Sequence, residues 1–493
     1  MLTIKKKLLI ISGFEANGFA GAVRDVQVAS ALGVSASMLI TTLTAQNSNH
    51  MSANHAVPAD VITKQLNSLL IAPQVLKIGV LPNREVSISI ATWLNKFSDK
   101  KPYVILDPVR LNSGDHLAFA SENLLSVIEP LLPFVDLLTP NLAELGTLVS
   151  QVDHSLSAEE VISQFFKMQP VFQGKLLVKG VMETLPLAHS IDILGTALGT
   201  DNFTYFSQRK HSLNMRGTGC LLSTAIGCAL CEDHPVESAI ALASAYLAQE
   251  FKAHEDSVHP SNLLPKTDWP DNIHYFPKVN HNISVPIQDS PFQPLTITQG
   301  LYPIVDSSTW VAKLAALGVK TIQLRIKNES MKEITTEIRR AIEISRQYSL
   351  QLFINDYWQI AIEHGAYGVH LGQEDLQSAN LASIQAAGIR LGVSTHGDYE
   401  FLIAHQLRPS YIAVGAIYPT QTKDMSGKIQ GLQRLKRYCQ MTGTTPIVAI
   451  GGINLSNVED VLKAKPSFIA VVSAITKSPT PSDTTQNFLH VLR

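Results

Sequence analysis

The chain has few cysteines, no excess of charge of one sign and no long apolar run. Its 493 residues include four cysteines, too few for a disulfide framework, and the formal net charge is −2, which provides no global field for nucleic acid or a membrane. The apolar run Leu8–Ile11 behind Lys5–Lys7 ends at Gly13, well short of a membrane span or a secretory signal. These absences predict a cytoplasmic protein without nucleic acid or membrane partners, and they leave a homo-oligomer open.

Two of the cysteines, Cys228 and Cys231, form a C-x-x-C pair. A structural zinc site normally needs four ligands, and the sequence has no second pair of this kind. Both cysteines lie in a stretch rich in Ala and Leu that is typical of a helix. We therefore interpret them as two buried helix residues.

The length exceeds what one hydrophobic core usually supports, which predicts two domains. In the first half, apolar runs alternate with helical patterns, and this indicates an α/β fold with a parallel, doubly wound sheet. A helix is expected from Ala20 to Leu32, and the capping-box pattern Ser157-x-x-Glu160 predicts the start of another. The expected strands are Leu8–Ser12, Ser37–Leu43, Val75–Val80, Tyr103–Asp107, Val135–Thr139 and Lys175–Lys179.

Residues 264–298 interrupt this alternation, because they are rich in proline and have no helical period. We interpret them as a connector between a first domain, 1–263, and a second domain, 299–493. The second domain contains eight shorter strand-like runs, which predict a compact (β/α)₈ TIM barrel. These runs are Leu301–Val305, Val319–Leu324, Gln351–Ile354, Tyr367–Leu371, Arg390–Val393, Tyr411–Val414, Pro446–Ile450 and Phe468–Val472.

Polar and charged side chains follow the expected barrel strands, at the end where a barrel forms its active site. Gln323, Arg325 and Lys327 alternate along one extended segment, so their side chains point the same way. Arginine can bind a phosphate through two hydrogen bonds and lysine adds a second positive charge. The sequence therefore predicts a site for a multiply charged anion.

Two further features of these strand ends suit phosphate chemistry. Asp356 and Asp375 follow neighbouring strands, and two carboxylates beside a phosphate suggest Mg²⁺. The pair Gly451-Gly452 lets backbone N–H groups approach a second phosphate, at a place where barrels often bind one.

Six motifs of this half resemble thiamine phosphate synthase, in the family's order and over nearly the whole half. They are Gln323-Leu-Arg325-x-Lys327, Ile354-Asn355-Asp356, Val369-His370-Leu-Gly-Gln373-Glu-Asp375, Gly-Val-Ser394-Thr-His396, Pro419-Thr420-x-Thr422-Lys423 and Ala-Ile-Gly-Gly452-Ile. The resemblance implies that Mg²⁺ is held by Asp356 and Asp375. The residues implied to bind the pyrimidine diphosphate are Gln323, Arg325, Lys327, Asn355, Ser394 and Lys423. Those implied to surround the thiazole phosphate are Thr420, Thr422, Gly452, Val472 and Ser473.

The reaction implied by this resemblance is dissociative, with Arg325, Lys327 and Lys423 as catalytic residues. Pyrophosphate leaves the pyrimidine methylene carbon, and the thiazole nitrogen attacks the resulting cation. One departure is Ile326, where the family usually has Glu, but this side chain should face away from the ligand. A related thiazole tautomerase is an alternative, and the two aspartates and the Gln-x-Arg-x-Lys series argue against it.

The first half carries two glycine-rich stretches of its own. One is Ile11–Gly21, at a strand-to-helix turn, and the other is Arg216-Gly217-Thr218-Gly219-Cys220, before an Ala-rich helix. Glycines at a helix N-terminus expose N–H groups that suit a transferring phosphoryl group. The same position is expected to lower the pKa of Cys220.

Seven motifs of this half are similar to hydroxymethylpyrimidine (phosphate) kinase, a family with the ribokinase-like fold, over about residues 8–255. They are Thr44-Ala-Gln46-Asn47, Lys77-Ile-Gly-Val80-Leu, Leu106-Asp107-Pro-Val109, Ser113-Gly-Asp115, Thr139-Pro-Asn141-Leu-x-Glu144, Val178-Lys179-Gly180 and Gly217-Thr-Gly-Cys220. The similarity implies ATP as co-substrate, Glu144 near Mg²⁺, Lys179 near ATP, and catalytic Cys220 at the phosphoryl-transfer centre with Gly217 and Gly219. The residues implied to line the pyrimidine pocket are Gly13, Asp25, Gln46, Val80 and Val109.

The first motif departs from the family's approximate pattern A-G-S-D-x-S-G-G-A-G. Phe14 and Phe19 add bulk beside the expected pocket, and Glu15 stands where the family has Asp. Met182 and Arg216 replace two residues that are commonly His. Two alternatives therefore stay open for the first half, a pyrimidine-binding module without kinase activity and a pyridoxal-type kinase.

Overall fold

The structure is a computed structural model, and the chain divides into two compact units. One unit comprises Met1–Pro270 with His274–Ser284, and the other comprises Asp271–Ile273 with Val285–Arg493. The described residues are 7–46, 51–97, 100–109, 123–149, 157–181, 189–197, 199, 202–208, 217–255, 265–281, 290–327, 329–420 and 429–492. None of the helices in these ranges combines the length and the apolar character that a bilayer crossing requires.

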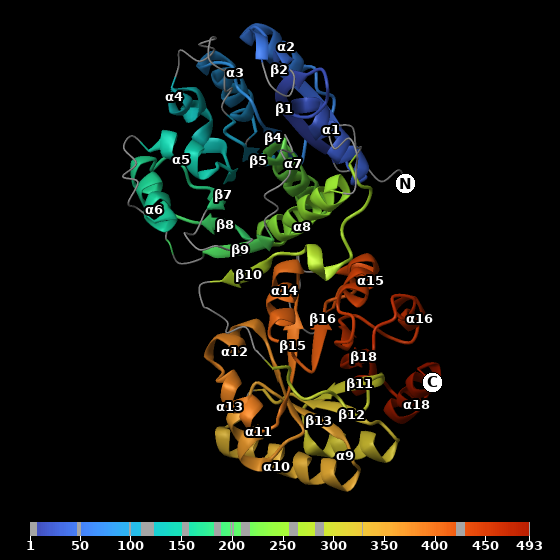
Figure 1. Cartoon of the computed structure of the whole chain (residues 1–493). Helices are drawn as coiled ribbons and strands as arrows, with labels where there is room; N and C mark the ends of the chain where they lie inside the picture. Colours follow the sequence, from blue (N-terminus) through green and yellow to red (C-terminus); the bar gives the residue numbers. More distant parts are fainter. Residues whose placement is uncertain are drawn as a thin grey trace. The chain divides into compact units, whose positions relative to one another are not determined.

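The first unit is built on a ten-stranded sheet with the order β10-β9-β8-β7-β6-β5-β4-β1-β2-β3 (Figure 1). Its strands are β1 (Lys7–Glu15), β2 (Ser35–Gln46), β3 (Met51–Ala56), β4 (Val75–Ile78), β5 (Tyr103–Leu106), β6 (Leu137–Leu138), β7 (Lys175–Val181), β8 (His189–Gly195), β9 (Phe203–Gln208) and β10 (Lys278–His281). Its helices are α1 (Gly21–Ala31), α2 (Ala59–Asn67), α3 (Arg84–Leu94), α4 (Leu124–Ile128), α5 (Leu142–Leu148), α6 (Ala158–Met168), α7 (Thr218–Cys231) and α8 (Val236–Glu255), with 3₁₀ turns η1 (Glu129–Phe134) and η3 (Ile273–Tyr275).

The expected parallel sheet is correct for six central strands and incomplete at both edges. Strands β2, β1, β4, β5, β6 and β7 pair in parallel, and they include all six of the runs expected from the sequence. The sequence analysis missed β3, which pairs antiparallel with β2, and the antiparallel series β7-β8-β9-β10. These edge strands lack the continuous apolar runs that mark a strand covered on both faces.

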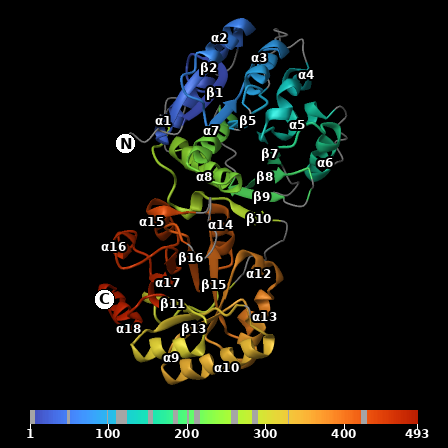
Figure 2. The same ribbon diagram turned by 180° about the vertical axis from the view of Figure 1, so that it is seen from behind.

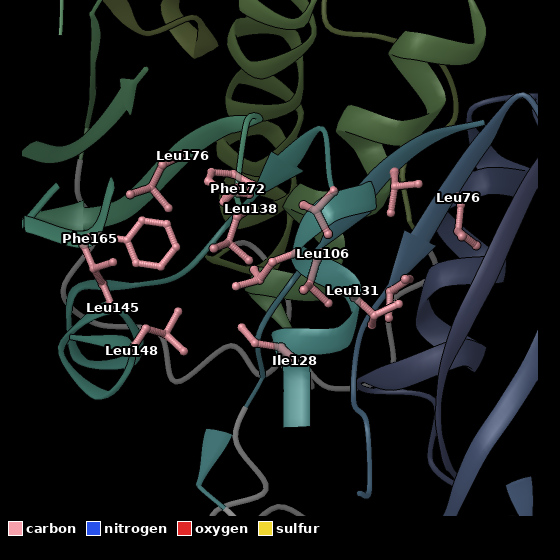
Figure 3. Packing of buried hydrophobic residues seen from close by; sticks show 14 of the residues in the cluster. Leu76, Leu106, Ile128, Leu131, Leu138, Leu145, Leu148, Phe165, Phe172 and Leu176 are labelled. Carbon is pink, nitrogen blue, oxygen red and sulfur yellow. The ribbon is translucent and has the colours of Figure 1, made fainter. Parts of the chain in front are cut away.

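Burial on both faces explains why the central strands are so apolar. Leu8, Leu9, Ile10 and Ile11 are successive residues of β1, and each is at most 1% exposed. Leu9 and Ile11 belong to the large cluster of apolar side chains that continues along the sheet through Leu76, Leu106, Leu138 and Leu176 to Phe165 of α6 (Figure 3). Alternate residues such as Leu8 face α7 on the opposite side. The capping box expected at Ser157 and Glu160 is confirmed at the start of α6.

The second unit is a closed barrel of eight parallel strands in chain order, as expected (Figure 2). Its strands are β11 (Gly300–Val305), β12 (Thr321–Leu324), β13 (Gln351–Asn355), β14 (Gly368–Leu371), β15 (Arg390–Thr395), β16 (Tyr411–Val414), β17 (Ile447–Ile450) and β18 (Phe468–Val471). Its helices are α9 (Ser308–Ala316), α10 (Met331–Gln347), α11 (Trp358–His364), α12 (Gln373–Ser378), α13 (Leu381–Ala386), α14 (Asp398–Gln406), α15 (Gly431–Met441), α16 (Val458–Leu462), α17 (Ser473–Thr476) and α18 (Pro481–Val491).

Aromatic side chains fill the inside of this barrel. Phe353 and Tyr411 meet edge to face with ring centroids 5.0 Å apart, and Tyr302 contacts both rings. Gly392 of β15 leaves the space that the Tyr411 ring occupies, since a Cβ atom there would collide with it. Large rings and missing side chains on neighbouring strands therefore complement each other, as close packing requires.

The stretch 264–298, expected to connect two domains, contributes to the fold of each unit. Within it, β10 adds the last strand to the first sheet. Farther along, the backbone N–H of Phe292 donates to the Arg408 carbonyl at 3.0 Å. Leu295 is 7% exposed and belongs to the cluster of apolar side chains inside the barrel, with Tyr302 and Phe353. Residues before the first barrel strand thus complete the barrel's core.

We predict that Leu295→Ala destabilises the barrel by roughly 2–5 kcal/mol, because it removes a buried side chain and leaves a cavity. Hydrogen exchange of the full chain, read by mass spectrometry on peptides of β11–β18, measures this as a lower free energy of opening. Leu455→Ala is the matched control, since Leu455 is 38% exposed, and it should change the same quantity by less than about 0.5 kcal/mol. Equal exchange in the two variants would contradict the role of Leu295.

Candidate active sites

The first unit contains a cavity of about 850 Å³ beyond the ends of its central strands. Its lining includes nine of the ten residues expected at the kinase site, namely Gly13, Gln46, Val80, Val109, Glu144, Lys179, Gly217, Gly219 and Cys220. Asp25, the tenth, is fully buried and does not line the cavity. The structure thus brings together residues that lie up to about 200 positions apart in the chain.

The two glycine-rich turns meet at this cavity. Helix α7 begins at Thr218, directly after Gly217, whose φ of 72° lies in the left-handed region that favours glycine. A Cβ atom on Gly217 would collide with the carbonyl of Phe19 in the first turn. The N–H of Gly21 donates to the Cys220 sulfur. The positive end of a fourteen-residue helix therefore faces the cavity beside a thiol, an arrangement that suits an anionic phosphoryl group.

Asp107 organises the polar groups at this end of the cavity. Its Oδ1 atom accepts hydrogen bonds from Lys179 Nζ at 2.6 Å and Thr139 Oγ1 at 3.1 Å, and its Oδ2 atom accepts one from Ser223 Oγ at 3.2 Å. Burial by itself would raise the pKa of Asp107, but Lys179 and Lys77 outweigh it and the pKa is lowered. Asp107 therefore carries its negative charge at neutral pH and fixes the position of Lys179. In the sequence, Asp107 is part of the motif Leu106-Asp107-Pro-Val109, from which no role was expected for it.

A second buried ion pair lies near this cluster. Lys77 Nζ contacts Asp25 Oδ2 at 2.6 Å with both side chains fully buried, and Thr224 Oγ1 donates to Asp25 Oδ1 at 2.8 Å. Burial raises the pKa of Asp25, and Lys77 opposes that rise. The pair joins α1, β4 and α7, the elements that carry the two turns. Asp25 thus joins the elements that surround the cavity and does not line the cavity.

The pKa expected for Cys220 is wrong in direction. Burial raises the pKa of its thiol to about 11, with Asp25 and Asp107 adding to the rise and Lys77 opposing it. The helix N-terminus does lie beside the sulfur, but the thiol is 7% exposed, and the two neighbouring carboxylates disfavour a thiolate. The sequence shows the helix position of a cysteine and not how deeply it is buried.

The departures in the first motif, which are Phe14, Glu15 and Phe19, lie within the described residues. Both carboxylate oxygens of Glu15 accept hydrogen bonds from the turn itself, Oε1 from Asn17 and Oε2 from the Phe19 N–H at 2.8 Å. Glu15 therefore closes the turn. These hydrogen bonds hold the backbone of the turn in place although the motif is altered. Phe14 lines the cavity. Met182 and Arg216 lie outside the described residues.

The cavity is lined both by residues that the sequence predicted and by residues that it did not. Glu144 was expected near Mg²⁺, and here its Oε2 atom accepts the Asn141 N–H at 2.8 Å within the capping box of α5. The residues that our sequence analysis missed include Asp192, Ser207 and Ser244, which also line the cavity. Burial raises the pKa of Asp192, and the Gly180 N–H, which donates to it at 2.8 Å, opposes the rise. Asp192 and Ser207 lie on β8 and β9, two strands that the sequence pattern did not reveal.

At the barrel, the carboxylates expected to bind metal lie close together. Asp356 follows β13, and Asp375 lies in the first turn of α12 after β14. Burial and the neighbouring charge of Asp375 raise the pKa of Asp356 to about 6, while Arg325 and Lys327 oppose the rise. Asp356 has a φ of 65°, and its N–H donates to the His370 carbonyl at 3.0 Å. Four of the expected residues therefore lie near one another at one end of the barrel, namely Asp356, Asp375, Arg325 and Lys327.

Two other residues expected to bind the diphosphate take part in a chain of hydrogen bonds inside the barrel. Gln323 is 2% exposed and hydrogen-bonds to Tyr302 and Tyr411, whose hydroxyl oxygens are 2.8 Å apart. His370 Nδ1 lies 2.7 Å from the Tyr411 hydroxyl, and His370 Nε2 lies 2.7 Å from Ser394 Oγ. Burial, with Arg325 and His396, lowers the pKa of His370 to about 3, so its ring is neutral.

This series of hydrogen bonds was not expected from the sequence. Tyr302 and Tyr411 were taken only as parts of apolar strands, and nothing in the sequence distinguishes their hydroxyl groups from those of other buried tyrosines. Asn355, the remaining predicted residue at this end, is 6% exposed at the end of β13.

The residues expected around the thiazole phosphate follow β16, β17 and β18. Gly452 has a φ of 69°, and its carbonyl accepts a hydrogen bond from Asn457 Nδ2 at 3.0 Å. Val472 and Ser473 lie at the start of α17, and Thr420 ends the described part of the loop after β16. Thr422 and Lys423 lie outside the described residues.

Comparison with known proteins finds two family models that match separate parts of the chain. Residues 16–262 match the family described as phosphomethylpyrimidine kinase, and residues 297–475 match the family described as thiamine monophosphate synthase. The second part is similar to the thiamine-phosphate synthase of Yersinia pestis (strain Pestoides F), with 53% identity over 193 residues, which is 39% of this chain and 90% of that protein.

Two solved structures resemble the first part at lower identity. A phosphomethylpyrimidine kinase from Clostridium difficile 630 is 24% identical and has a TM-score of 0.40, covering 50% of this chain and 100% of its own. A pyridoxal kinase from Staphylococcus aureus in complex with pyridoxal is 22% identical and has a TM-score of 0.46, covering 57% of this chain and 99% of its own.

We predict that Cys220 in the folded chain reacts slowly with iodoacetamide at pH 8 and faster as the pH approaches 11, because the thiolate is the nucleophile. Its pKa is raised, so the fraction of thiolate at pH 8 is small. Mass spectrometry of the peptide that contains Cys220 measures the rate at each pH. The same peptide in urea is the control and should titrate near its ordinary value of about 8.5. A folded-state profile with that lower midpoint would contradict the prediction.

We also predict that one aspartate of the Mg²⁺-free chain titrates near pH 6 in a ¹³C NMR titration of aspartate-labelled protein, and that this is Asp356. Asp25 and Asp192 also have raised pKa values, so the resonance is assigned by its loss in Asp356→Asn. In Asp375→Asn the midpoint should fall, because a like charge is removed, and it should stay above the ordinary value because burial remains. An unchanged midpoint in Asp375→Asn would show that the two carboxylates do not interact.

Proposed function

Because the chain belongs to the phosphomethylpyrimidine kinase family through its first unit and to the thiamine monophosphate synthase family through its second, we propose that it catalyses consecutive reactions of thiamine biosynthesis. The first unit uses ATP to phosphorylate hydroxymethylpyrimidine and then its monophosphate. The second joins the resulting diphosphate to thiazole phosphate and releases pyrophosphate. The observation that carries this proposal is the continuity of substrate, since the product of one family is the substrate of the other.

In the first unit, the geometry of the cavity supports phosphoryl transfer. The start of α7 and the side-chain-free positions Gly217 and Gly219 would bind the transferring group, where the helix's partial positive charge stabilises developing negative charge. Lys179, held by Asp107, would bind the phosphates of ATP from the neighbouring strand. Cys220 would contact the transfer centre as a protonated thiol, because burial raises its pKa to about 11. The altered turn with Phe14 and Glu15 would form the pyrimidine side.

In the barrel, the residues present fit a magnesium ion. The neighbouring charge of Asp375 raises the cost of ionising Asp356, and a divalent cation relieves this repulsion. The described residues contain no group of three or more His, Cys, Asp or Glu side chains around one point, so phosphate oxygens and water would complete the coordination. When bound, Mg²⁺ neutralises charge on the leaving pyrophosphate.

The rest of the barrel site would hold the two rings and the leaving group. Arg325 and Lys327 would contact the diphosphate oxygens, which gain negative charge as the bond to carbon breaks. Gln323, Asn355 and Ser394 would orient the pyrimidine ring. No general base is needed to form the new carbon–nitrogen bond, and His370 agrees with that chemistry because its lowered pKa of about 3 makes its ring a weak base. The loops after β16, β17 and β18 would bind the thiazole phosphate through backbone N–H groups.

The proposal is tested by four assays on the full chain. ATP is supplied with hydroxymethylpyrimidine, with its monophosphate and with pyridoxal, and the pyrimidine diphosphate is supplied with thiazole phosphate and Mg²⁺. We expect product in both pyrimidine assays and in the condensation, and much slower turnover of pyridoxal. Phosphorylation of pyridoxal alone would replace the kinase assignment with the pyridoxal alternative, and no phosphorylation at all would leave a pyrimidine-binding module.

Two variants should separate the activities. Arg325→Ala is expected to lower condensation by about 100-fold or more and to leave the kinase unchanged, because it removes a charged hydrogen bond to the leaving group. Cys220→Ala is expected to lower the kinase activity by a similar factor and to leave condensation unchanged. Arg339→Ala, an exposed residue of α10, and Cys231→Ala, a second buried cysteine of α7, are the matched controls and should keep both activities. Full condensation activity in Arg325→Ala would place the diphosphate elsewhere.

A further inference from the structure

A histidine–glutamate pair lies at the carboxyl ends of the barrel strands, outside the set of residues that we proposed above to bind the substrates. His396 directly follows β15, and Glu400 lies in the first turn of α14. The Glu400 Oε2 atom lies 2.9 Å from His396 Nδ1 and accepts the His396 backbone N–H at 2.7 Å. Gln430 Nε2 donates to the His396 carbonyl at 2.6 Å. His396 is therefore fixed at both of its backbone groups and at one ring nitrogen.

The alternation of side chains along β15 directs the His396 ring toward the proposed ligand. Gly392 leaves room for a ring inside the barrel, and Ser394 Oγ lies 2.7 Å from His370 Nε2. Every second side chain of an extended segment points the same way, so His396 continues this inward series one step beyond Ser394. Besides burial, Arg325 and His396 lower the pKa of His370, so both side chains lie near that ring.

The two nitrogens of the His396 ring have different surroundings. Glu400 accepts the Tyr399 hydroxyl at 3.2 Å as well as the His396 backbone N–H, as a carboxylate does. An imidazole is more basic than a carboxylate, so the hydrogen between them lies on Nδ1. Within the described ranges no hydrogen bond engages Nε2, and the side chain is 16% exposed. Nε2 is thus the ring atom that can meet a ligand, whereas both nitrogens of His370 contact protein groups.

We propose that His396 is a further binding residue for the diphosphate, whose Nε2–H donates to a phosphate oxygen while Glu400 holds the ring from behind. This inference rests on the proposed function, which places the diphosphate at Arg325. Because Nδ1–H already donates to Glu400, Nε2 can donate only when the ring carries a second hydrogen. A neutral ring therefore takes up one proton from solvent as the diphosphate binds. The resulting cation lies between the carboxylate and the phosphate, and its N–H stabilises the charge that pyrophosphate gains on leaving.

The charged and titratable neighbours of His396 leave this proton to its ring. On α14, Asp398 is 1% exposed and forms an ion pair with Arg437. On β14, the pKa of His370 is lowered to about 3, so that ring stays neutral. Glu400 is the carboxylate that contacts His396 directly. Among these groups, the ring of His396 is the one that can gain a proton near neutral pH.

The test is a calorimetric titration of the full chain with inorganic pyrophosphate and Mg²⁺ at pH 8, in two buffers that differ in ionisation enthalpy. The difference in heat between the buffers gives the number of protons taken up on binding. His396→Gln is expected to bind pyrophosphate about tenfold more weakly and to take up fewer protons than wild type, by up to about one, since both the charged hydrogen bond and the titrating ring are removed. His490→Gln, which changes an exposed histidine of α18, is the matched control and should behave as wild type. Equal affinity, or equal proton uptake, in wild type and His396→Gln would overturn the proposal.

Glu400→Gln tests the positioning role of the carboxylate by a double-mutant cycle on condensation. The amide keeps an acceptor for the His396 N–H and loses the charge that holds the protonated ring. We expect kcat/KM to fall about tenfold in the wild-type background and to change little in the His396→Gln background, because the ring that Glu400 holds is then absent. Proton uptake with pyrophosphate should fall as well. An equal loss in both backgrounds would assign Glu400 to the start of α14 alone and overturn its positioning role.

The failure of this inference can be told apart from the failure of the proposed function. His396→Gln should lower kcat/KM for condensation by about tenfold or more and leave ATP-dependent phosphorylation unchanged, with circular dichroism as the check that the chain folds. Wild-type kcat/KM in a folded His396→Gln chain would overturn the inference and leave the synthase assignment intact. A wild-type chain that makes no thiamine phosphate would instead overturn the proposed function.

Discussion

Both units depend on one constraint, which is that a parallel strand covered on both faces can place polar side chains at low cost only near its carboxyl end. β1 shows the constraint, with four successive apolar residues that are at most 1% exposed. Because all the strand ends of such a sheet lie along one edge, side chains that are distant in the sequence are brought together there. Asp107 and Lys179 meet in this way in the first unit, and Asp356 and Asp375 meet in the barrel.

The two sites treat buried charge differently, and the difference matches the chemistry proposed for each. In the first unit each central carboxylate contacts an ammonium group, as in Asp25 with Lys77 and Asp107 with Lys179, so that the charges are balanced within the protein. In the barrel, Asp356 faces another carboxylate, and its pKa is raised to about 6. The proposed Mg²⁺ would relieve this repulsion, whereas Asp25 and Asp107 of the first unit already contact lysines and the start of α7 faces the cavity.

The core of the barrel also contributes to the site above it. Aromatic rings fill the interior, and two of them carry hydroxyl groups that cannot remain buried without partners. Satisfying those hydroxyl groups leads through His370 to Ser394, at the edge of the proposed ligand site. The packing of the barrel and the position of Ser394 are therefore linked through the same few side chains.

The sequence by itself determined the eight barrel strands, the six central strands of the first sheet and most of the expected residues that line the cavity of the first unit, because apolar runs and the polar residues that follow them are local patterns. It did not reveal β3, β8, β9 and β10, whose pairing at the sheet edges depends on partners rather than on a pattern of their own. It also gave the wrong direction for the pKa of Cys220, because proximity to a helix N-terminus is written in the sequence while burial beside Asp25 and Asp107 is not. The pairing of Lys77 with Asp25 and the path from Tyr302 to Ser394 were decided by the tertiary structure alone, since each joins residues from separate elements that only folding brings within hydrogen-bonding distance.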